Sequence, residues 1–178
     1  MTETTTPATT RLWTNEGFRD DDWAHAETVD ALAGNSRVIL PLAAFLALDD
    51  ETRSRLGDRI GVHVMPGEAL DALVPHLGTV ALVSLAFPAF SDGRSYSKAQ
   101  LLRERHGYEG VVRASGDVLI DQIPLMLRTG FSEFEVSNET ALARLGQGRV
   151  GGIDFHYQPA ATQEPGGPAY SWRRVATV

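Results

Sequence analysis

The sequence predicts an α/β fold made of repeated strand–helix (βα) units. Three observations support this: short apolar segments alternate five times with segments of helical spacing, short connections join them, and the apolar segments suit burial on both faces of a sheet. Right-handed crossovers between such units give a mainly parallel sheet. Two architectures stay open, a partial or small (β/α) barrel and an open three-layer sheet, and both place ligand sites at the C-terminal ends of the strands.

Five strands are expected after an irregular beginning. They are 37–42, 59–66, 79–88, 109–117 and 131–136, with a further strand at 152–159. The segment 79–88 (TVALVSLAFP) gives the strongest signal, because it is almost continuously apolar and β-branched at its start. By contrast, 59–66 and 131–136 alternate apolar and polar residues, as half-buried strands do.

A helix is expected after each of these five strands. The segments with helical spacing are 43–57, 67–78, 91–107, 118–130 and 138–148. Glycine marks the ends of the first three, at Gly57, Gly78 and Gly107. Ser95 or Ser97 is the expected N-cap of the third helix, and Asn138 that of the last. The fourth helix is expected to contain a proline, Pro124.

The chain is expected to form one domain with two irregular ends. Residues 37–159 make the single α/β domain, 1–36 an irregular N-terminal arm, and 160–178 a C-terminal tail rich in Pro and Gly. Aromatic side chains are expected to anchor these ends, namely Trp13, Phe18 and Trp23 in the arm and Trp172 in the tail. The ends suit folding back as well as crossing to a second subunit, so the oligomeric state stays open.

The composition excludes several functions. The 178 residues include no cysteine, which excludes disulfides, thiol nucleophiles, zinc–thiolate sites and self-ligated iron–sulfur clusters. A net charge of −7 argues against nucleic-acid or anionic-membrane binding. The N-terminus is unlike a secretory signal, and the longest apolar run, 80–90, is far shorter than the roughly 20 residues of a membrane helix. We therefore expect a cytoplasmic protein.

No cofactor or metal site is expected from the sequence motifs. The sequence contains no GxGxxG, P-loop, GxSxG or HExxH motif. Its five histidines show no metal-ligand spacing.

The first candidate site follows the strand at 79–88. It consists of Ser91, Asp92, Gly93, Arg94 and Ser95. Free backbone N–H groups at the start of the next helix, together with the fork-shaped guanidinium of Arg94, suit a small anion such as a carboxylate, sulfate or phosphate. Asp92 suits orienting Arg94, a catalytic role as a proton acceptor, or a contribution to a metal site. The alternative is that Asp92 and Arg94 pair with each other and only stabilise the turn.

The second candidate site follows the strand at 109–117. It consists of Arg113, Ser115, Gly116, Asp117, Asp121 and Gln122. Asp117 and Asp121 are four residues apart and are expected on one helix face, where two carboxylates can divide acid and base roles or bind a divalent cation. An arginine inside an apolar strand needs a partner, and the candidates are Asp92, Asp117 and Asp121.

Four segments carry a family resemblance. They are FPAFSDGRSYS (87–97), LLRERHGY (101–108), RASGDVLIDQ (113–122) and the GF-x-x-F-x-V ending (130–136). Together they resemble a family of small uncharacterised bacterial proteins that are named as oxidoreductases of sulfite reduction. The genes of this family often lie beside those for a sirohaem sulfite/nitrite reductase and a phosphoadenylyl-sulfate reductase. The resemblance extends from about Val38 to 156–160. A common family form has an acidic residue where this chain has Val112, so any role of that acid is absent here.

The resemblance implies a place in assimilatory sulfur metabolism and leaves three hypotheses. An accessory protein would bind a sulfur-pathway anion, through Arg94 and Arg113, or the sulfite/nitrite reductase or another sulfur-assimilation enzyme. An enzyme would use Asp92, Asp117 and Asp121 on an anionic substrate. A structural partner would have no ligand site. Because no flavin, nicotinamide or haem motif is present, redox chemistry would need a partner or a bound cofactor of another kind.

Overall fold

The computed structural model of the chain describes residues 10–152. Its strands are β1 (Arg11–Thr14), β2 (Gly17–Arg19), β3 (Trp23–His25), β4 (Arg37–Pro41), β5 (Ile60–Val64), β6 (Leu82–Phe87), β7 (Val111–Gly116) and β8 (Glu133–Val136). Its α-helices are α1 (Leu42–Leu46), α2 (Asp50–Leu56), α3 (Arg94–Gln100), α4 (Ile123–Thr129) and α5 (Glu139–Gly146). The expected strand at 152–159 and the tail at 160–178 extend beyond the described residues.

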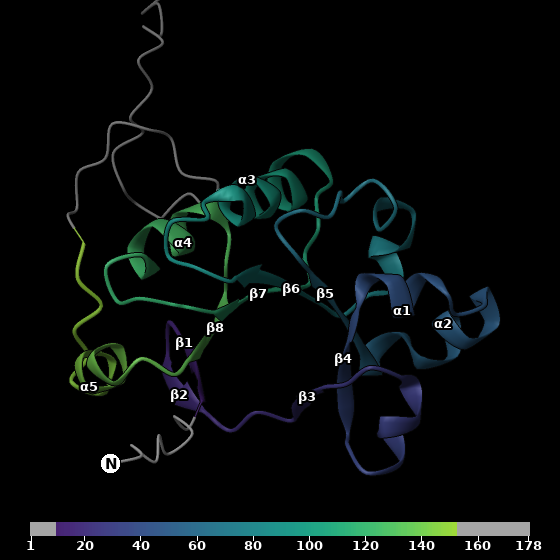
Figure 1. The fold of residues 1–178 in the computed structure, drawn as a ribbon, viewed down its shortest axis with the longest axis horizontal. Coiled ribbons are helices and arrows are strands. Elements are labelled where there is room, and N and C mark those ends of the chain that lie inside the picture. The colour runs from purple at the N-terminus through teal and green to yellow at the C-terminus, as the bar shows by residue number, and fades with distance from the viewer. Residues whose placement is uncertain (1–9, 153–178) are drawn as a thin grey trace, which may run out of the picture.

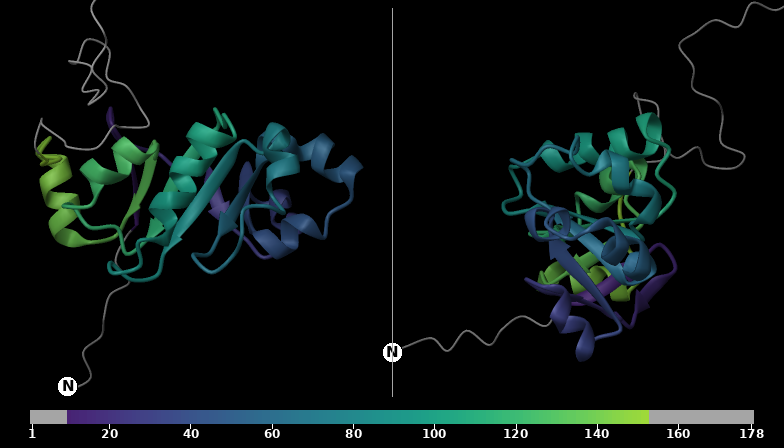
Figure 2. Two further views of the ribbon diagram at one scale, coloured as in Figure 1. Left: turned by 90° about the horizontal axis from the view of Figure 1, so that it is seen from above. Right: turned by 90° about the vertical axis from the view of Figure 1, so that its right-hand side faces the viewer.

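All eight described strands form one sheet, in the order β2-β1-β8-β7-β6-β5-β4-β3. Strands β3 to β8 run parallel to one another, and β1 joins β8 in the antiparallel sense. The sheet curls into a half-barrel with helices α1 to α5 outside the curve (Figure 1). The prediction of repeated βα units in a mainly parallel, partial barrel is therefore confirmed. Seen from above, the helices lie across the outside of the strands (Figure 2).

The main apolar core lies between the outer face of the sheet and these helices. Successive side chains of a strand point to opposite faces, and Val83, Leu85 and Phe87 of β6 belong to this core. The alternate residues Leu82, Ser84 and Ala86 are also buried, but they are not part of that cluster. They face the inside of the half-barrel.

Residues 11–25 contribute three strands, whereas the sequence predicts an irregular arm there. Strands of three or four residues are too short to show a periodic pattern, and pairing with β8 and β4 stabilises them. The expected anchoring by Trp13 does occur, because this side chain is buried with its ring centroid 5.4 Å from that of Phe134. Residues 17–25, which we call the strap, run from the β2 edge of the sheet to the β3 edge.

The helices differ from the expected ones mainly where proline or a new N-cap intervenes. The first expected helix is divided into α1 and α2, because Asp49 caps α2 by accepting from Thr52 N at 2.8 Å. The second is a set of turns ending in a 3₁₀ helix, η3 (Val74–Thr79), with proline in its first turn. In the same way, Pro124 lies in the first turn of α4 rather than in its interior.

The expected caps are partly correct. Asn138 caps α5 through a 3.0 Å hydrogen bond from Ala141 N. The N-cap of α3 is Gly93, whereas Ser95 and Ser97 lie inside the helix. Helix α3 continues into a π-helical turn, η4 (Leu101–Arg105), and Gly107 follows with the positive φ of +61° that suits glycine. No helix in the described part of the chain has both the length and the apolar character of a membrane span.

Candidate functional site

The two loops predicted from the sequence meet at the C-terminal ends of β6 and β7. Gln122 Nε2 donates to the carbonyl of Phe90 at 2.9 Å, and Asp117 N donates to the carbonyl of Phe87 at 2.7 Å. Gly116 allows this close approach: its φ is +95°, and a Cβ there would lie 2.4 Å from the Phe87 carbonyl oxygen. The two loops therefore form one edge, which we call the strand-end edge.

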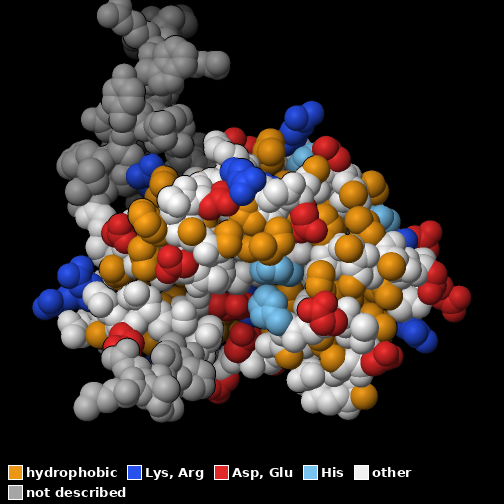
Figure 3. Space-filling view, viewed as in Figure 1, with side chains coloured by type: hydrophobic (Ala, Val, Ile, Leu, Met, Phe, Trp, Pro, Cys, Tyr) orange, Lys and Arg blue, Asp and Glu red, His pale blue; other side chains and the backbone are white. Residues whose placement is uncertain are grey.

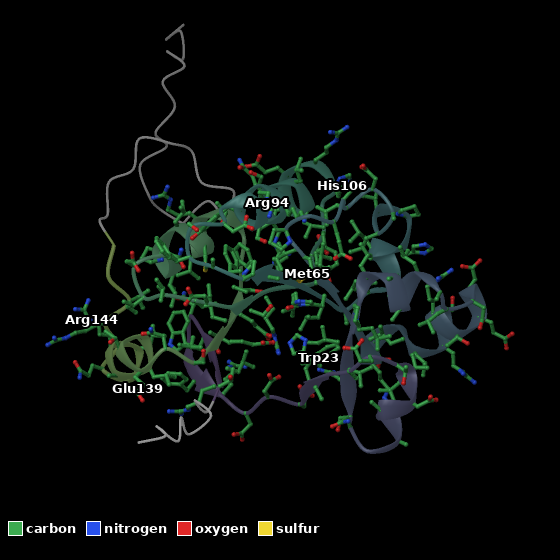
Figure 4. The ribbon with its side chains drawn as sticks, in the orientation of Figure 1. Trp23, Met65, Arg94, His106, Glu139 and Arg144 are labelled. Carbon is green, nitrogen blue, oxygen red and sulfur yellow. The ribbon has the colours of Figure 1, made fainter. Side chains whose placement is uncertain are left out.

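Arg94 and Asp92 pair with each other on this edge. Arg94 Nε donates to one carboxylate oxygen of Asp92 at 2.9 Å, and Nη2 donates to the other at 2.7 Å. These hydrogen bonds hold the pKa of Asp92 below its usual value. The guanidinium nevertheless stays accessible, since 64% of the Arg94 side chain is exposed (Figure 4). The pairing that the sequence offered as an alternative is thus present, without burying the cation.

The other residues predicted near Arg94 have structural contacts or lie in solvent. The buried hydroxyl of Ser95 donates to the carbonyl of Ala86 at 2.6 Å, which ties α3 to β6. Ser91 and Gly93 are exposed in the loop. Tyr96 is half-buried, and its burial, together with the charge of Asp121, raises its pKa to about 12.

The expected helical pairing of Asp117 and Asp121 is wrong. Both residues are exposed and lie before α4, which begins only at Ile123, so the i,i+4 spacing of a helix does not apply to them. Gln122 has a positioning role, because its Oε1 also accepts from Leu119 N at 3.3 Å. No acid–base pair of these two carboxylates is therefore built on a common helix face.

Arg113 has partners other than the expected Asp92, Asp117 and Asp121. It points into the half-barrel, is 0% exposed, and binds three carboxylates. Its guanidinium donates to Asp21 at 2.8 and 3.0 Å, to Glu133 at 2.6 and 2.9 Å, and to Glu135 at 3.2 Å. Burial opposes its charge, but these partners outweigh burial and raise the pKa of Arg113.

The expected partners of Arg113 were wrong because its side chain points into the half-barrel and not toward the strand-end loops. In β7, Arg113 and Ser115 point inward, whereas the loop carboxylates lie beyond the strand ends. The register instead aligns Arg113 with Glu133 of β8 and with Ser84 of β6. Asp21 reaches the guanidinium from the strap, so this ion pair joins the strap to the opposite wall of the half-barrel.

Two histidines extend the polar contacts along the inner face. His25 of the strap donates from Nε2 to Glu135 at 2.9 Å, and its ring lies edge-on to that of His63, with centroids 5.2 Å apart. His63 Nδ1 lies 3.2 Å from Ser84 Oγ, which donates to Ser115 Oγ at 3.0 Å. These contacts define the inner network: Asp21, His25, His63, Ser84, Arg113, Ser115, Glu133 and Glu135. Histidine and acidic side chains gather at the middle of the molecular face in Figure 3.

The environment shifts the pKa values of two members of the inner network. Burial and the neighbouring His25 lower the pKa of His63, against the opposing charges of Glu135 and Glu68. Burial of Glu135 opposes its charge, but His25 and Arg113 outweigh it and lower its pKa. At neutral pH, His63 is therefore uncharged and Glu135 ionised.

Sequence reasoning missed six members of this network: Asp21, His25, His63, Ser84, Glu133 and Glu135. One available signal was the alternation in FSEFEV (131–136), which puts Glu133 and Glu135 on one face of a strand next to that of Arg113. No local pattern could have found Asp21 and His25, because the path of the strap brings them to the network.

The inner network consists of hydrogen bonds and ion pairs. Across the described residues, no group of three or more His, Cys, Asp or Glu side chains suits a metal ion. A hollow of about 580 Å³ lies beside Asp21, at the ends of β1 and β2, and is lined by Thr10, Arg11, Leu12, Phe18, Arg19, Asp20 and Asp21. Since Arg113 already binds three carboxylates, it offers no site to an anion.

A protein-family model matches the part of the sequence that forms most of this architecture. No curated protein matches the sequence. A family model described as a bacterial protein of unknown function (DUF934) matches residues 61–167. The match includes the strand-end edge and the inner network from β5 to β8, whereas the strap with Asp21 and His25 precedes it. This match spans more than half of the chain, so the protein belongs to the DUF934 family of bacterial proteins.

Proposed function

We propose that this protein is an accessory protein of assimilatory sulfite or sulfate reduction, and that it acts by binding the reductase through the strand-end edge. The resemblance of its sequence motifs to a family named for sulfite reduction supports a role in this pathway. The observation that carries the binding role is that two of these motifs, FPAFSDGRSYS and RASGDVLIDQ, meet on this accessible edge, joined by the hydrogen bond from Gln122 to Phe90.

The chemistry of the edge favours a protein partner over a free sulfur-pathway anion. Phe90 is 64% exposed in the same loop as Arg94, whose guanidinium is accessible. Met65, after the end of β5, and Leu125, on α4, are further exposed apolar side chains. Exposed aromatic side chains and arginines are both enriched at protein interfaces. Asp92 already occupies two donors of Arg94, which weakens this guanidinium as the sole holder of a small anion.

An accessory role also fits the amino-acid composition. The sequence contains no cysteine, so the chain has neither a thiol–disulfide couple nor cysteine ligands for an iron–sulfur cluster. In the proposed role, the reductase transfers the electrons and this protein changes its turnover or its assembly.

The test is the turnover of purified sulfite reductase with and without this protein, combined with retention of the reductase on the immobilised chain. We expect both to depend on the edge, and to fall at least severalfold in Arg94→Glu and Phe90→Ser. Arg144→Glu, on the exposed surface of α5, is the matched control and should behave as the unchanged protein (Figure 4). Equal turnover and retention for all variants, and without the protein, would overturn the proposal.

Binding of a free anion instead of the reductase is tested in a second experiment. Sulfite, sulfate and a sulfonucleotide are each added to the chain alone, and thermal unfolding is measured. Stabilisation by one of them that Arg94→Glu abolishes, without retention of the reductase, would replace the protein partner by an anionic ligand.

A further inference from the structure

A groove of about 380 Å³ lies between the helix formed by α3 and η4 and the segment 69–75, which leads into η3. Its apolar lining includes Leu70 and Val74 from this segment and Leu101 from the helix. The Leu101 side chain is 42% exposed, so the described residues leave part of the apolar lining uncovered. A concave, largely apolar site of this volume with a few polar groups is typical of small-molecule binding.

The π-helical turn shapes the helical wall of this groove. In an α-helix, residues five apart lie about 140° apart around the axis, so His106 would point away from Leu101. Here His106 N donates to the carbonyl of Leu101 at 3.1 Å, which is the i→i+5 hydrogen bond of a π turn and brings the two residues toward the same side. Arg105 and His106 both line the groove together with Leu101 as a result.

Two cations border the groove without an acidic partner. Among residues 10–152, neither Lys98 nor Arg105 forms an ion pair. Lys98 Nζ instead donates to the carbonyls of Met65 and Pro66, at 2.5 and 3.0 Å, which holds the ammonium group in place and leaves it one further N–H donor. Partial burial lowers the pKa of Lys98, so its positive charge is less well compensated than it would be in water.

The charges and the apolar lining together favour one class of occupant. Asp71 is the acid in the lining, against the cations Lys98 and Arg105. Glu68, whose charge also acts on Lys98, lies outside the lining, and its carboxylate accepts from a backbone N–H at 2.7 Å. An acidic group would compensate the two cations, and an apolar body would remove Leu101 from water. An inorganic anion would supply only the first contribution, and a neutral apolar molecule only the second.

We propose that this groove binds a small organic anion with an apolar body, such as an aryl-alkyl carboxylate. The acidic group binds Lys98 and Arg105, and the apolar body covers Leu101. Arg94 begins the α3–η4 helix and His106 follows its end, so the groove is separate from the strand-end edge on which the proposed function rests (Figure 4).

The test is an NMR titration of the full chain, labelled with ¹⁵N-lysine and ¹⁵N-histidine, with phenylacetate as the probe. Because Lys98 is the only lysine of the sequence, its backbone amide gives a single lysine signal at the groove. We expect saturable shifts of this amide and of the His106 ring, whereas the ring of His25, on the inner face, should not shift. Phenylacetamide should bind severalfold more weakly, and phenethylammonium and acetate should give no saturable shift.

Two variants make the result specific. Arg105→Glu should weaken phenylacetate binding about tenfold or more, as expected for the loss of one charge-assisted hydrogen bond. Leu101→Ser should also weaken it, because the apolar contact is lost. Arg144→Glu, on the exposed surface of α5, is the matched charge control and should bind as the unchanged protein. Circular dichroism and thermal unfolding check that each variant folds.

Several results would overturn the proposal. They are no saturable shift with phenylacetate, equal shifts with phenethylammonium, and equal affinity in Arg105→Glu and Arg144→Glu. Equal shifts with acetate would mean an adventitious ion only. Shifts of Lys98 and His106 that grow with protein concentration, without any probe, would assign the groove to a second copy of the chain instead.

Discussion

The two faces of the same sheet have opposite chemistry. On the outer face, Phe87 and Phe134 pack in an apolar layer under the helices. On the inner face, alternate positions of the same strands place Arg113, Ser115 and Glu135 in a hydrogen-bonded network. The outer face is stabilised by removal of apolar area from water, whereas the inner face depends on complete pairing of its charges. The difference teaches that both faces contribute to stability, the outer face through apolar packing and the inner face through paired charges.

The largest expected loss of stability is in Phe87→Ala, which removes a buried ring from the outer face of the sheet. The ring of Phe87 packs against those of Tyr96 and Phe131, with centroids at 5.2 and 5.7 Å. Its loss leaves a cavity and should lower the free energy of unfolding by about 3–5 kcal/mol, as measured by urea denaturation. Phe90→Ala, at an exposed position, is the control and should cost less than about 0.5 kcal/mol. Equal effects would contradict a core beneath the helices.

The next largest loss of stability is expected in Arg113→Met, which removes the central cation of the inner face. Removal of the guanidinium leaves three carboxylates facing one another without their cation. The free energy of unfolding should fall by about 3 kcal/mol. Adding Glu133→Gln should regain part of the loss, since one negative charge disappears. Arg94→Met, at the exposed ion pair, should leave urea unfolding unchanged. A loss in Arg94→Met equal to that in Arg113→Met would show that burial does not distinguish the two arginines.

The sequence predicts the strands and their apolar outer face more completely than the polar contacts of the inner face. Apolar periodicity identifies β4 to β8, because each strand carries its own pattern, and the alternation with helices predicts that these strands run mainly parallel. It also places both candidate loops at strand ends, and the structure joins them through Gln122 and Phe90. The strap is different: β2 and β3 are three residues long, and pairing with strands distant in sequence stabilises them.

The partners of Arg113 show what the sequence could not supply. A buried arginine required carboxylates, and this requirement was met. The sequence pointed to acids near in the chain, but the inward direction of the side chain selects Glu133 and Glu135 on the neighbouring strand. Asp21 is 92 residues away and reaches Arg113 only because the strap crosses the half-barrel. Such contacts follow from topology rather than from local pattern.

A smaller effect is expected where a single hydrogen bond ties a helix to the sheet. The buried Ser95 hydroxyl donates to the carbonyl of Ala86, so Ser95→Ala leaves that carbonyl without this partner. The free energy of unfolding should fall by about 1–2 kcal/mol in urea. Ser97→Ala, at an exposed position of the same helix, is the matched control and should have almost no effect. An equal loss for both serines would contradict a specific contribution of the Ser95 hydrogen bond, since the higher helix propensity of alanine favours both variants.

The smallest effect is a change in pH dependence on the inner face. His25 and Arg113 lower the pKa of Glu135 below its ordinary value of 4.5, so the folded chain holds this carboxylate ionised where the unfolded chain begins to bind a proton. The stability from Glu135 is therefore complete above about pH 4.5 and is lost as the pH falls through the lower folded pKa. Glu135→Gln should weaken the pH dependence of urea unfolding in this acid range, whereas Glu139→Gln, exposed at the start of α5, should leave it unchanged. The same acid slope in both variants would mean that the paired charges of the inner face do not contribute to stability, and that the contrast between the two faces is one of packing alone.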